Sequence, residues 1–236
     1  MNKQSNTYTI IYIIVLVVVV GTALALTSIS LKDRQKANAD ADKMRQILAS
    51  VNITVPSQDI VTTYGETVSN AFVVNSKGEK VDNTAPAFDV NVASQSKASA
   101  SERLLPVYEC TVDGAVKYVL PMYGAGLWGP IWGYVSVDAD GSTIYGAYFD
   151  HEGETPGLGA EIAKPAFSDQ FKGKRLFVNG NFEPVEVVKN GMKPTGNADY
   201  VDGISGGTIT SKGVGAMIDN CLAPYSAFLN SLGNNK

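Results

Sequence analysis

An uncharged segment near the N-terminus places the strongest constraint on how this chain folds. No charged residue occurs from Tyr8 to Leu31, and the part from Ile10 to Val20 is almost purely aliphatic. About twenty such residues in a helix span a hydrocarbon core of about 30 Å. A cleaved signal peptide has a shorter apolar region and a small-residue cleavage site, which Ala-Leu-Ala-Leu-Thr-Ser fits poorly. The segment therefore predicts a retained membrane anchor that crosses the bilayer once.

The rest of the chain is long enough for one domain of ordinary size. We expect an N-terminal stub and transmembrane helix at 1–31, a stalk or linker at 32–60 and the domain at 61–236. Asp113-Gly114 separates two alternating segments and predicts a β-hairpin. The fold class expected is α+β, with a mixed or antiparallel sheet, flanking helices and a long C-terminal helix.

Composition excludes several function classes. The net charge is −4 with no basic block, so nucleic acid is not an expected partner. One histidine and two cysteines exclude a zinc ribbon, a disulfide framework and a multi-histidine metal cage within this chain. Cys110 and Cys221 form one disulfide, are two free core thiols, or are ligands to a cofactor shared with another subunit. The apolar helical face around Cys221 favours free thiols over the disulfide.

A glycine- and hydroxyl-rich run, Asp-Gly-Ile-Ser-Gly-Gly-Thr-Ile-Thr at 202–210, leads directly into a pattern of apolar residues at steps of three and four. Thr208 and Thr210 thus lie where a helix begins, a position where hydroxyls cap backbone N–H groups and where an anion is stabilised. By residue type alone, a glycine turn followed by an N-cap explains the run.

Two further blocks precede this run. At 124–134 glycines alternate with large aromatic residues, and at 148–161 a Pro-Gly turn lies between acidic and hydroxyl groups. The simpler interpretation of the first block is a tight turn before a strand with both tryptophans buried. His151, the only histidine, lies in the second block and is expected to be a solvated loop residue.

The run at 202–210 resembles the flavinylation motif Asp-x-x-Ser-Gly-Ala-Thr-x-Thr, with Gly207 in place of the usual alanine. The resemblance implies that Thr210 carries FMN through a phosphoester bond. A separate flavin transferase would make that bond with FAD as donor. With Gly-Leu-Trp-Gly-Pro-Ile-Trp-Gly and Glu-Thr-Pro-Gly-Leu-Gly ahead of it, the chain resembles the C subunits of sodium-translocating NADH:quinone reductases over most of 105–232. One extra residue between His151 and Glu154 is a second departure.

The resemblance, together with residue type, implies a flavin site. Leu127 and Trp128 would wall the ring on one side, and Glu154 would hydrogen-bond the ring or the ribityl chain. Asp202 would shape the turn or bind a metal of the transferase. No catalytic residue and no metal ligand is assigned. The expected FMN-binding residues are Leu127, Trp128, Glu154, Thr155, Gly157, Leu158, Ser205, Gly206, Gly207, Thr208 and Thr210.

The family implies an electron-carrying subunit of a respiratory complex that couples NADH oxidation and quinone reduction to sodium transport. The chain has no dinucleotide fingerprint and no charged intramembrane residue, so NADH oxidation and ion transport would belong to other membrane and cytoplasmic subunits. Membrane lipid and the flavin transferase are further expected partners. The family places the domain on the periplasmic side of a bacterial inner membrane. The positive-inside rule favours the opposite orientation, because Lys32, Arg34 and Lys36 follow the helix whereas only Lys3 precedes it, which would put the domain in the cytoplasm.

Two alternatives remain open at this stage. One is the paralogous subunit of the ferredoxin-dependent electron-transport complex, which shares Glu-Thr-Pro-Gly-Leu-Gly and the flavinylation motif but lacks Gly-Leu-Trp-Gly-Pro. The other is a membrane-anchored binding module without a redox role.

Overall fold

The computed structural model describes residues 6–82 and 84–233, and the chain divides into two compact units, 1–43 and 44–236. Helix α1 covers Asn6–Ser50, so the boundary between the units falls within it. Its apolar part has a mean hydropathy of 2.8, is not buried, and is long and apolar enough to cross a membrane. α1 continues to Ser50, within the stretch 32–60 that was expected to form a stalk or linker, and the bounds at 31 and 60 remain predictions. Lys3 lies outside the described residues.

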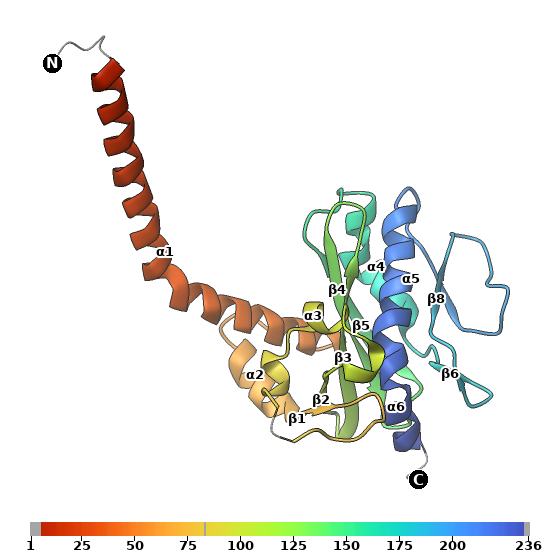
Figure 1. The fold of residues 1–236 in the computed structure, drawn as a ribbon. Helices are drawn as coiled ribbons and strands as arrows, with labels where there is room; N and C mark the ends of the chain where they lie inside the picture. The colour runs from red at the N-terminus through yellow and green to blue at the C-terminus, as the bar shows by residue number, and fades with distance from the viewer. Residues whose placement is uncertain (1–5, 83, 234–236) are drawn as a thin grey trace. The chain divides into compact units, whose positions relative to one another are not determined.

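The second unit is built on a five-stranded antiparallel sheet in which each strand pairs with the next in the order β1-β2-β3-β4-β5 (Figure 1). The strands are β1 Val68–Val74, β2 Leu105–Val112, β3 Ala115–Ala125, β4 Pro130–Asp138 and β5 Ile144–His151. Two small sheets follow, β6 Phe177–Val178 with β7 Asn181–Phe182 and β8 Glu186–Val188 with β9 Tyr200–Asp202. The helices after α1 are α2 Ile60–Thr67, α3 Val92–Gln95, α4 Pro165–Ser168, α5 Thr208–Leu222 and α6 Ser226–Gly233. The α+β class and the antiparallel sheet are confirmed.

Each face of the sheet packs against its own core. Neighbouring residues of a strand point to opposite sides and therefore belong to different cores. Leu120 of β3 belongs to the larger core, whereas Val119 belongs to a smaller core on the other face. α5 lies along β3 over the larger core, as the blue helix in Figure 1 shows, and contributes Val214 and Ile218. The sheet is therefore the middle layer of the domain.

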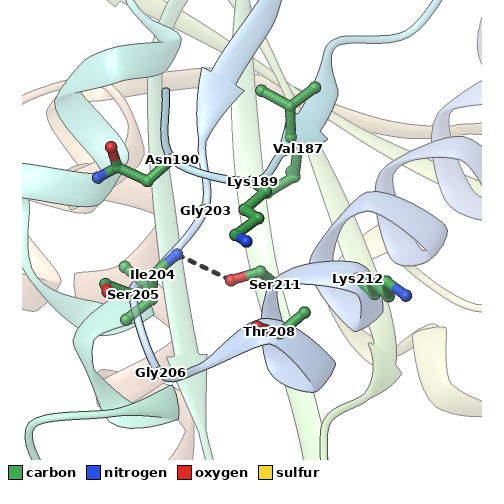
Figure 2. Close-up of a pocket in the computed structure, with 11 residues that line it drawn as sticks. Val187, Lys189, Asn190, Gly203, Ile204, Ser205, Gly206, Thr208, Ser211 and Lys212 are labelled. Atoms are coloured by element: carbon green, nitrogen blue, oxygen red, sulfur yellow. Dashed lines mark hydrogen bonds between the residues drawn. The ribbon is translucent and has the colours of Figure 1, made fainter. Parts of the chain in front are cut away.

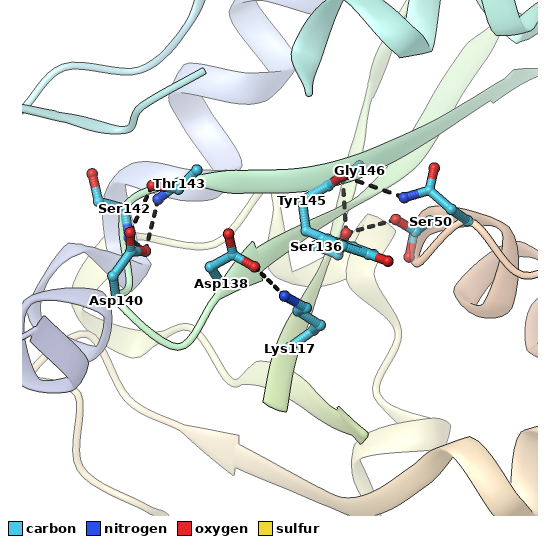
Figure 3. Close-up of polar contacts among 10 residues, drawn as sticks. Ser50, Lys117, Ser136, Asp138, Asp140, Ser142, Thr143, Tyr145 and Gly146 are labelled. Atoms are coloured by element: carbon cyan, nitrogen blue, oxygen red, sulfur yellow. Dashed lines mark hydrogen bonds and ion pairs between the residues drawn. The ribbon is translucent and has the colours of Figure 1, made fainter. Parts of the chain in front are cut away.

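The smaller core is closed by the end of α1, where Ile47 is completely buried. The buried Ser136 hydroxyl of β4 lies 2.6 Å from the carbonyl oxygen of Ser50 and 3.1 Å from that of Gly146 (Figure 3). A side chain at Gly146 would meet the Ser50 carbonyl, so glycine permits this close approach. The last turn of α1 is thus an integral part of the domain.

The cysteines are free and buried, so the disulfide alternative is wrong. Cys110 lies in the smaller core and Cys221 in the larger one, on opposite faces of the sheet. The hairpin prediction is confirmed: Asp113 and Gly114 have φ angles of 50° and 76° and link β2 to β3. The expected single C-terminal helix is interrupted, because Pro224 falls in a short 3₁₀ turn between α5 and α6.

Candidate functional site

The side chains of Thr210 and Glu154 meet where the loop after β5 packs on the first turn of α5. The Thr210 hydroxyl donates a hydrogen bond of 2.5 Å to Oε2 of Glu154. Thr210 is 1% exposed and Glu154 is 4% exposed. A buried carboxylate needs such donors because it has lost its water.

The second oxygen of Glu154 faces the loop between β3 and β4. Its Oε1 accepts a hydrogen bond of 2.8 Å from the backbone N–H of Trp128. Burial by itself raises the pKa of Glu154, but the hydrogen bonds from Thr210 and from the amides of Trp128 and Leu127, helped by His151, outweigh burial and lower it. The group is therefore a fixed negative charge at neutral pH.

Two glycines let the backbone approach this carboxylate from both sides. A Cβ atom at Gly126 or at Gly159 would lie closer than 3.0 Å to a Glu154 oxygen, and one at Gly159 would also contact Oγ1 of Thr210. Neither glycine was among the predicted site residues. Both glycines stand in motifs that the sequence analysis singled out, the alternation of glycine with aromatic residues and Pro-Gly-Leu-Gly. The need for glycine at these two positions shows only once the side chain that packs against them, Glu154, is known.

A cavity of about 430 Å³ opens beside the pair. Its volume falls within the range of about 300–1,000 Å³ that is usual for ligand pockets. Its lining residues come from the β3–β4 loop, the β5 loop and the start of α5. They are Leu127, Trp128, Glu154, Thr155, Leu158, Gly159, Gly206, Gly207, Thr208, Ile209 and Thr210. The structure thus brings together nine of the eleven predicted residues, and adds Gly159 and Ile209.

The rim of this cavity is apolar and open to solvent. Trp128 is 68% exposed and Ile209 is 57% exposed, with Leu127 and Leu158 also exposed. The expectation that both tryptophans of the first block are buried is therefore wrong for Trp128, and Trp132 is only half-buried. A large exposed indole beside a cavity suits a flat apolar ligand.

The two remaining predicted residues lie elsewhere. Ser205 lines a neighbouring cavity of about 410 Å³, together with Lys189 and Ser211 (Figure 2). There the Ser211 hydroxyl accepts a hydrogen bond of 2.8 Å from the backbone of Ile204, which fixes the loop. Gly157 has a φ of 74° and forms the Pro-Gly turn, where its N–H donates to Glu161.

Two side chains that were left outside the site shape it. Nδ1 of His151 accepts a hydrogen bond of 3.2 Å from the backbone N–H of Glu154, so His151 is half-buried and orders the loop rather than being merely solvated. Asp202 accepts from the N–H of Gly191 at 3.1 Å. This contact ties Asp202 to the loop between β8 and β9, and the roles expected of Asp202 stay predictions.

The start of α5 is suited to a phosphate. Gly207 is its N-cap residue, and no side chain of the described residues caps the helix there. The predicted hydroxyl cap is therefore absent from the described part of the chain. The first amides of a helix have no partner within it, and the first three residues of this 15-residue helix line the cavity. An apolar cavity, a fixed carboxylate, a hydroxyl and uncapped amides together fit FMN, which has a flat ring at one end and a phosphate at the other.

Comparisons with known proteins point to the same ligand. Residues 126–223 match the family model of the FMN-binding domain. The C subunit of the Na(+)-translocating NADH-quinone reductase of Vibrio vulnificus is 30% identical over 187 residues, which cover 73% of each chain. The C subunit of the Chlamydia trachomatis reductase is 38% identical over 161 residues, covering 62% of this chain and 49% of its own.

Two crystal structures share the fold. The C subunit of the Na(+)-translocating NADH-quinone reductase from Parabacteroides distasonis superposes with a TM-score of 0.78 at 54% identity, covering 84% of this chain and 96% of that one. The NqrC structure from Shewanella oneidensis gives a TM-score of 0.69 at 26% identity, covering 84% of this chain and 99% of that one.

Proposed function

The chain belongs to the family of C subunits of the Na(+)-translocating NADH-quinone reductase, and from this premise we propose that it carries electrons on an FMN esterified through its phosphate to Thr210. Membership makes it an FMN-binding subunit of an oxidoreductase complex. The covalent bond, its position and the side of the membrane are the proposed parts. The names of these relatives favour this function over the ferredoxin-linked paralogue, and the FMN-binding match favours it over a module without a redox role.

One observation carries the proposal: the Thr210 hydroxyl lies at a cavity whose walls come from three separate sequence blocks. An ordinary N-cap needs none of those walls. The exposed hydroxyl of Thr208 lies at the same helix end, but only Thr210 contacts a buried carboxylate. Glycine at 159 keeps space for both the Thr210 hydroxyl and the carboxylate, and glycine at 126 keeps space for the carboxylate.

We assign the surrounding residues the following roles. FMN, when bound, supplies the capacity to accept and release electrons. Trp128 and Leu127 bind the ring by apolar contact, with Leu158 on the other side. The uncapped start of α5, after Gly207, stabilises the phosphate charge.

The partners follow from the same proposal. α1 crosses the bacterial inner membrane among lipid and the other subunits, and the flavin domain lies on the periplasmic side, where a flavin transferase uses FAD to modify it. The sequence lacks a dinucleotide fingerprint and a charged intramembrane residue, so NADH oxidation and sodium movement belong to partner subunits.

Intact-mass measurement of the full chain, co-produced with a flavin transferase, tests the attachment. We expect a gain equal to one FMN minus water, lost in Thr210→Ala and retained in the control Thr111→Ala, which changes an exposed threonine of β2. An unmodified wild-type mass, or flavin that leaves on denaturation, would refute covalent attachment. Protease digestion of spheroplasts tests sidedness, since only a periplasmic domain is cleaved before lysis.

A further inference from the structure

We propose that Glu154 accepts the proton of the Thr210 hydroxyl when that hydroxyl is esterified, so that this chain supplies the base for its own modification. The inference rests on the proposed attachment of FMN to Thr210. It assigns to Glu154 a chemical step before the flavin is in place, in addition to any contact with the bound ring.

The hydrogen-bond geometry points to this step. A threonine hydroxyl carries one proton, and here that proton is directed at Oε2 of Glu154 over 2.5 Å. A lone pair of Oγ1 therefore remains available to attack, with the proton held by a base, as general-base catalysis requires. Among the hydrogen bonds of the described residues, Glu154 is the side-chain partner of Thr210.

The carboxylate is held in position for this role. Its other oxygen accepts from the Trp128 amide at 2.8 Å, and the backbone at Gly126 and Gly159 approaches the two carboxylate oxygens so closely that a Cβ atom at either position would clash with them. Neighbouring acids are directed elsewhere: Glu161 accepts from Gly157, and Glu152 is exposed. A base that is already held next to the reacting hydroxyl loses little conformational entropy when the proton is transferred.

The proton affinity of Glu154 rises as the reaction proceeds. The hydrogen bond from Thr210 is one reason why the pKa of Glu154 is low in the unmodified chain. When Oγ1 bonds to phosphorus, that hydrogen bond is lost and a phosphate anion lies nearby. Both changes favour the protonated carboxyl.

The step balances with FAD as co-reactant. Oγ1 of Thr210 forms a bond to the riboflavin-side phosphorus, and the phosphoanhydride bond of FAD breaks. AMP leaves with the electron pair of that bond. The hydroxyl proton passes to Oε2 of Glu154 and then to solvent. The sum is one threonine and one FAD converted into one phosphodiester, AMP and a proton, with no oxidant or reductant consumed.

The test measures the rate of covalent FMN incorporation into full-length unmodified chain, with purified flavin transferase and FAD, by mass and by fluorescence after denaturation. Glu154→Gln keeps the shape and removes the base. We expect incorporation to slow by about 100-fold or more, the usual scale of general-base catalysis. Glu152→Gln, an exposed neighbour in the same loop, is expected to match the wild-type rate.

A second measurement separates a base from a packing group. In Glu154→Ala we expect added formate to restore part of the incorporation rate, because it supplies a carboxylate at the vacated position. Formate is not expected to accelerate the wild-type chain. Should E154Q melt below the assay temperature, Glu154→Asp replaces it, with a rate expected below that of the wild type because the oxygen is withdrawn.

The outcomes also separate this inference from the proposed function. A wild-type chain that takes up no FMN at Thr210 refutes the attachment itself. A wild-type chain that is modified, beside folded E154Q or E154A modified equally fast, retains the attachment and overturns the role of Glu154. Failure of formate to accelerate E154A would likewise assign the base to the transferase.

Discussion

The Thr210 hydroxyl and Oε2 of Glu154 lie 2.5 Å apart although the two residues are separated by 56 positions in the chain. This contact joins the loop after β5 to the first turn of α5, and it is buried from water. The same pair thus links two parts of the fold and defines the end of the cavity. The ionisation of Glu154 therefore affects the stability of the fold as well as the chemistry at Thr210.

We predict that the unmodified chain loses stability in acid through Glu154. Its pKa is lowered in the folded protein, below the ordinary value of 4.5. A carboxyl group whose pKa is lower in the folded than in the unfolded state contributes stability that is fully present above the unfolded-state pKa. This stability is lost as the pH falls through the folded-state pKa. Urea unfolding from about pH 7 to about pH 3 should show the difference between wild type and E154Q shrinking below about pH 4.5.

Glu152→Gln is the control for this pH series, because Glu152 is an exposed carboxyl two residues away in the same loop. At neutral pH, E154Q itself should be less stable by about 1–3 kcal/mol, the scale for losing hydrogen bonds to a buried charge. A wild-type–E154Q difference that stays constant down to about pH 3 would contradict the ionised state assigned to Glu154.

Gly159→Ala should disturb the cavity directly. The added methyl group would overlap a Glu154 oxygen and Oγ1 of Thr210, so the hydrogen-bonded pair would have to shift. We expect a loss of about 1–3 kcal/mol in unfolding free energy, typical of overpacking, together with slower FMN incorporation. Gly153→Ala is the matched control, since nothing lies within 4 Å of its added atom. Equal incorporation rates in the two variants would show that the close packing at 159 is not needed.

The sequence was sufficient to predict the anchor, the hairpin and most of the cavity walls. Those predictions rest on local patterns: an uncharged run, alternation about Asp113-Gly114, and motifs whose residues share one site. The two small residues that shape the carboxylate pocket, Gly126 and Gly159, were not predicted. A glycine required by a distant side chain has no local signature, because the constraint lies in the opposing atom.

The role of the end of α1 was also not predictable. Residues 32–50 are mostly polar and were expected to form a stalk, yet Gln46 to Ser50 include buried positions that close the smaller core. Gln46 accepts a hydrogen bond of 3.1 Å from the indole N–H of Trp132. A polar side chain whose partner is an indole on a distant strand looks like a surface residue in the sequence.

The free cysteines give a further prediction. Burial raises the pKa of Cys110 to about 12, helped by the charge of Glu109, and burial likewise raises that of Cys221. Thiolates are the reactive species, so both should resist iodoacetamide in the folded protein near pH 8 and react after unfolding. Counting carbamidomethyl groups by mass, without reductant, checks this. A protein that stays unlabelled in denaturant would indicate a disulfide.

The contact between the end of α1 and the sheet should be sensitive to one methyl group. In Gly146→Ala the new atom would overlap the Ser50 carbonyl, which is backbone and cannot move without shifting the helix end. We expect a loss of about 1–3 kcal/mol, or about 2–4 °C in Tm for each kcal/mol in a domain of this size. The amides of 44–52 should exchange hydrogen faster, because their tie to Ser136 is weakened. Gly196→Ala, an exposed glycine with open space around it, is the control. If exchange at 44–52 is the same in both variants, the last turn of α1 is held by its apolar contacts alone, and the Ser136 hydrogen bond contributes little.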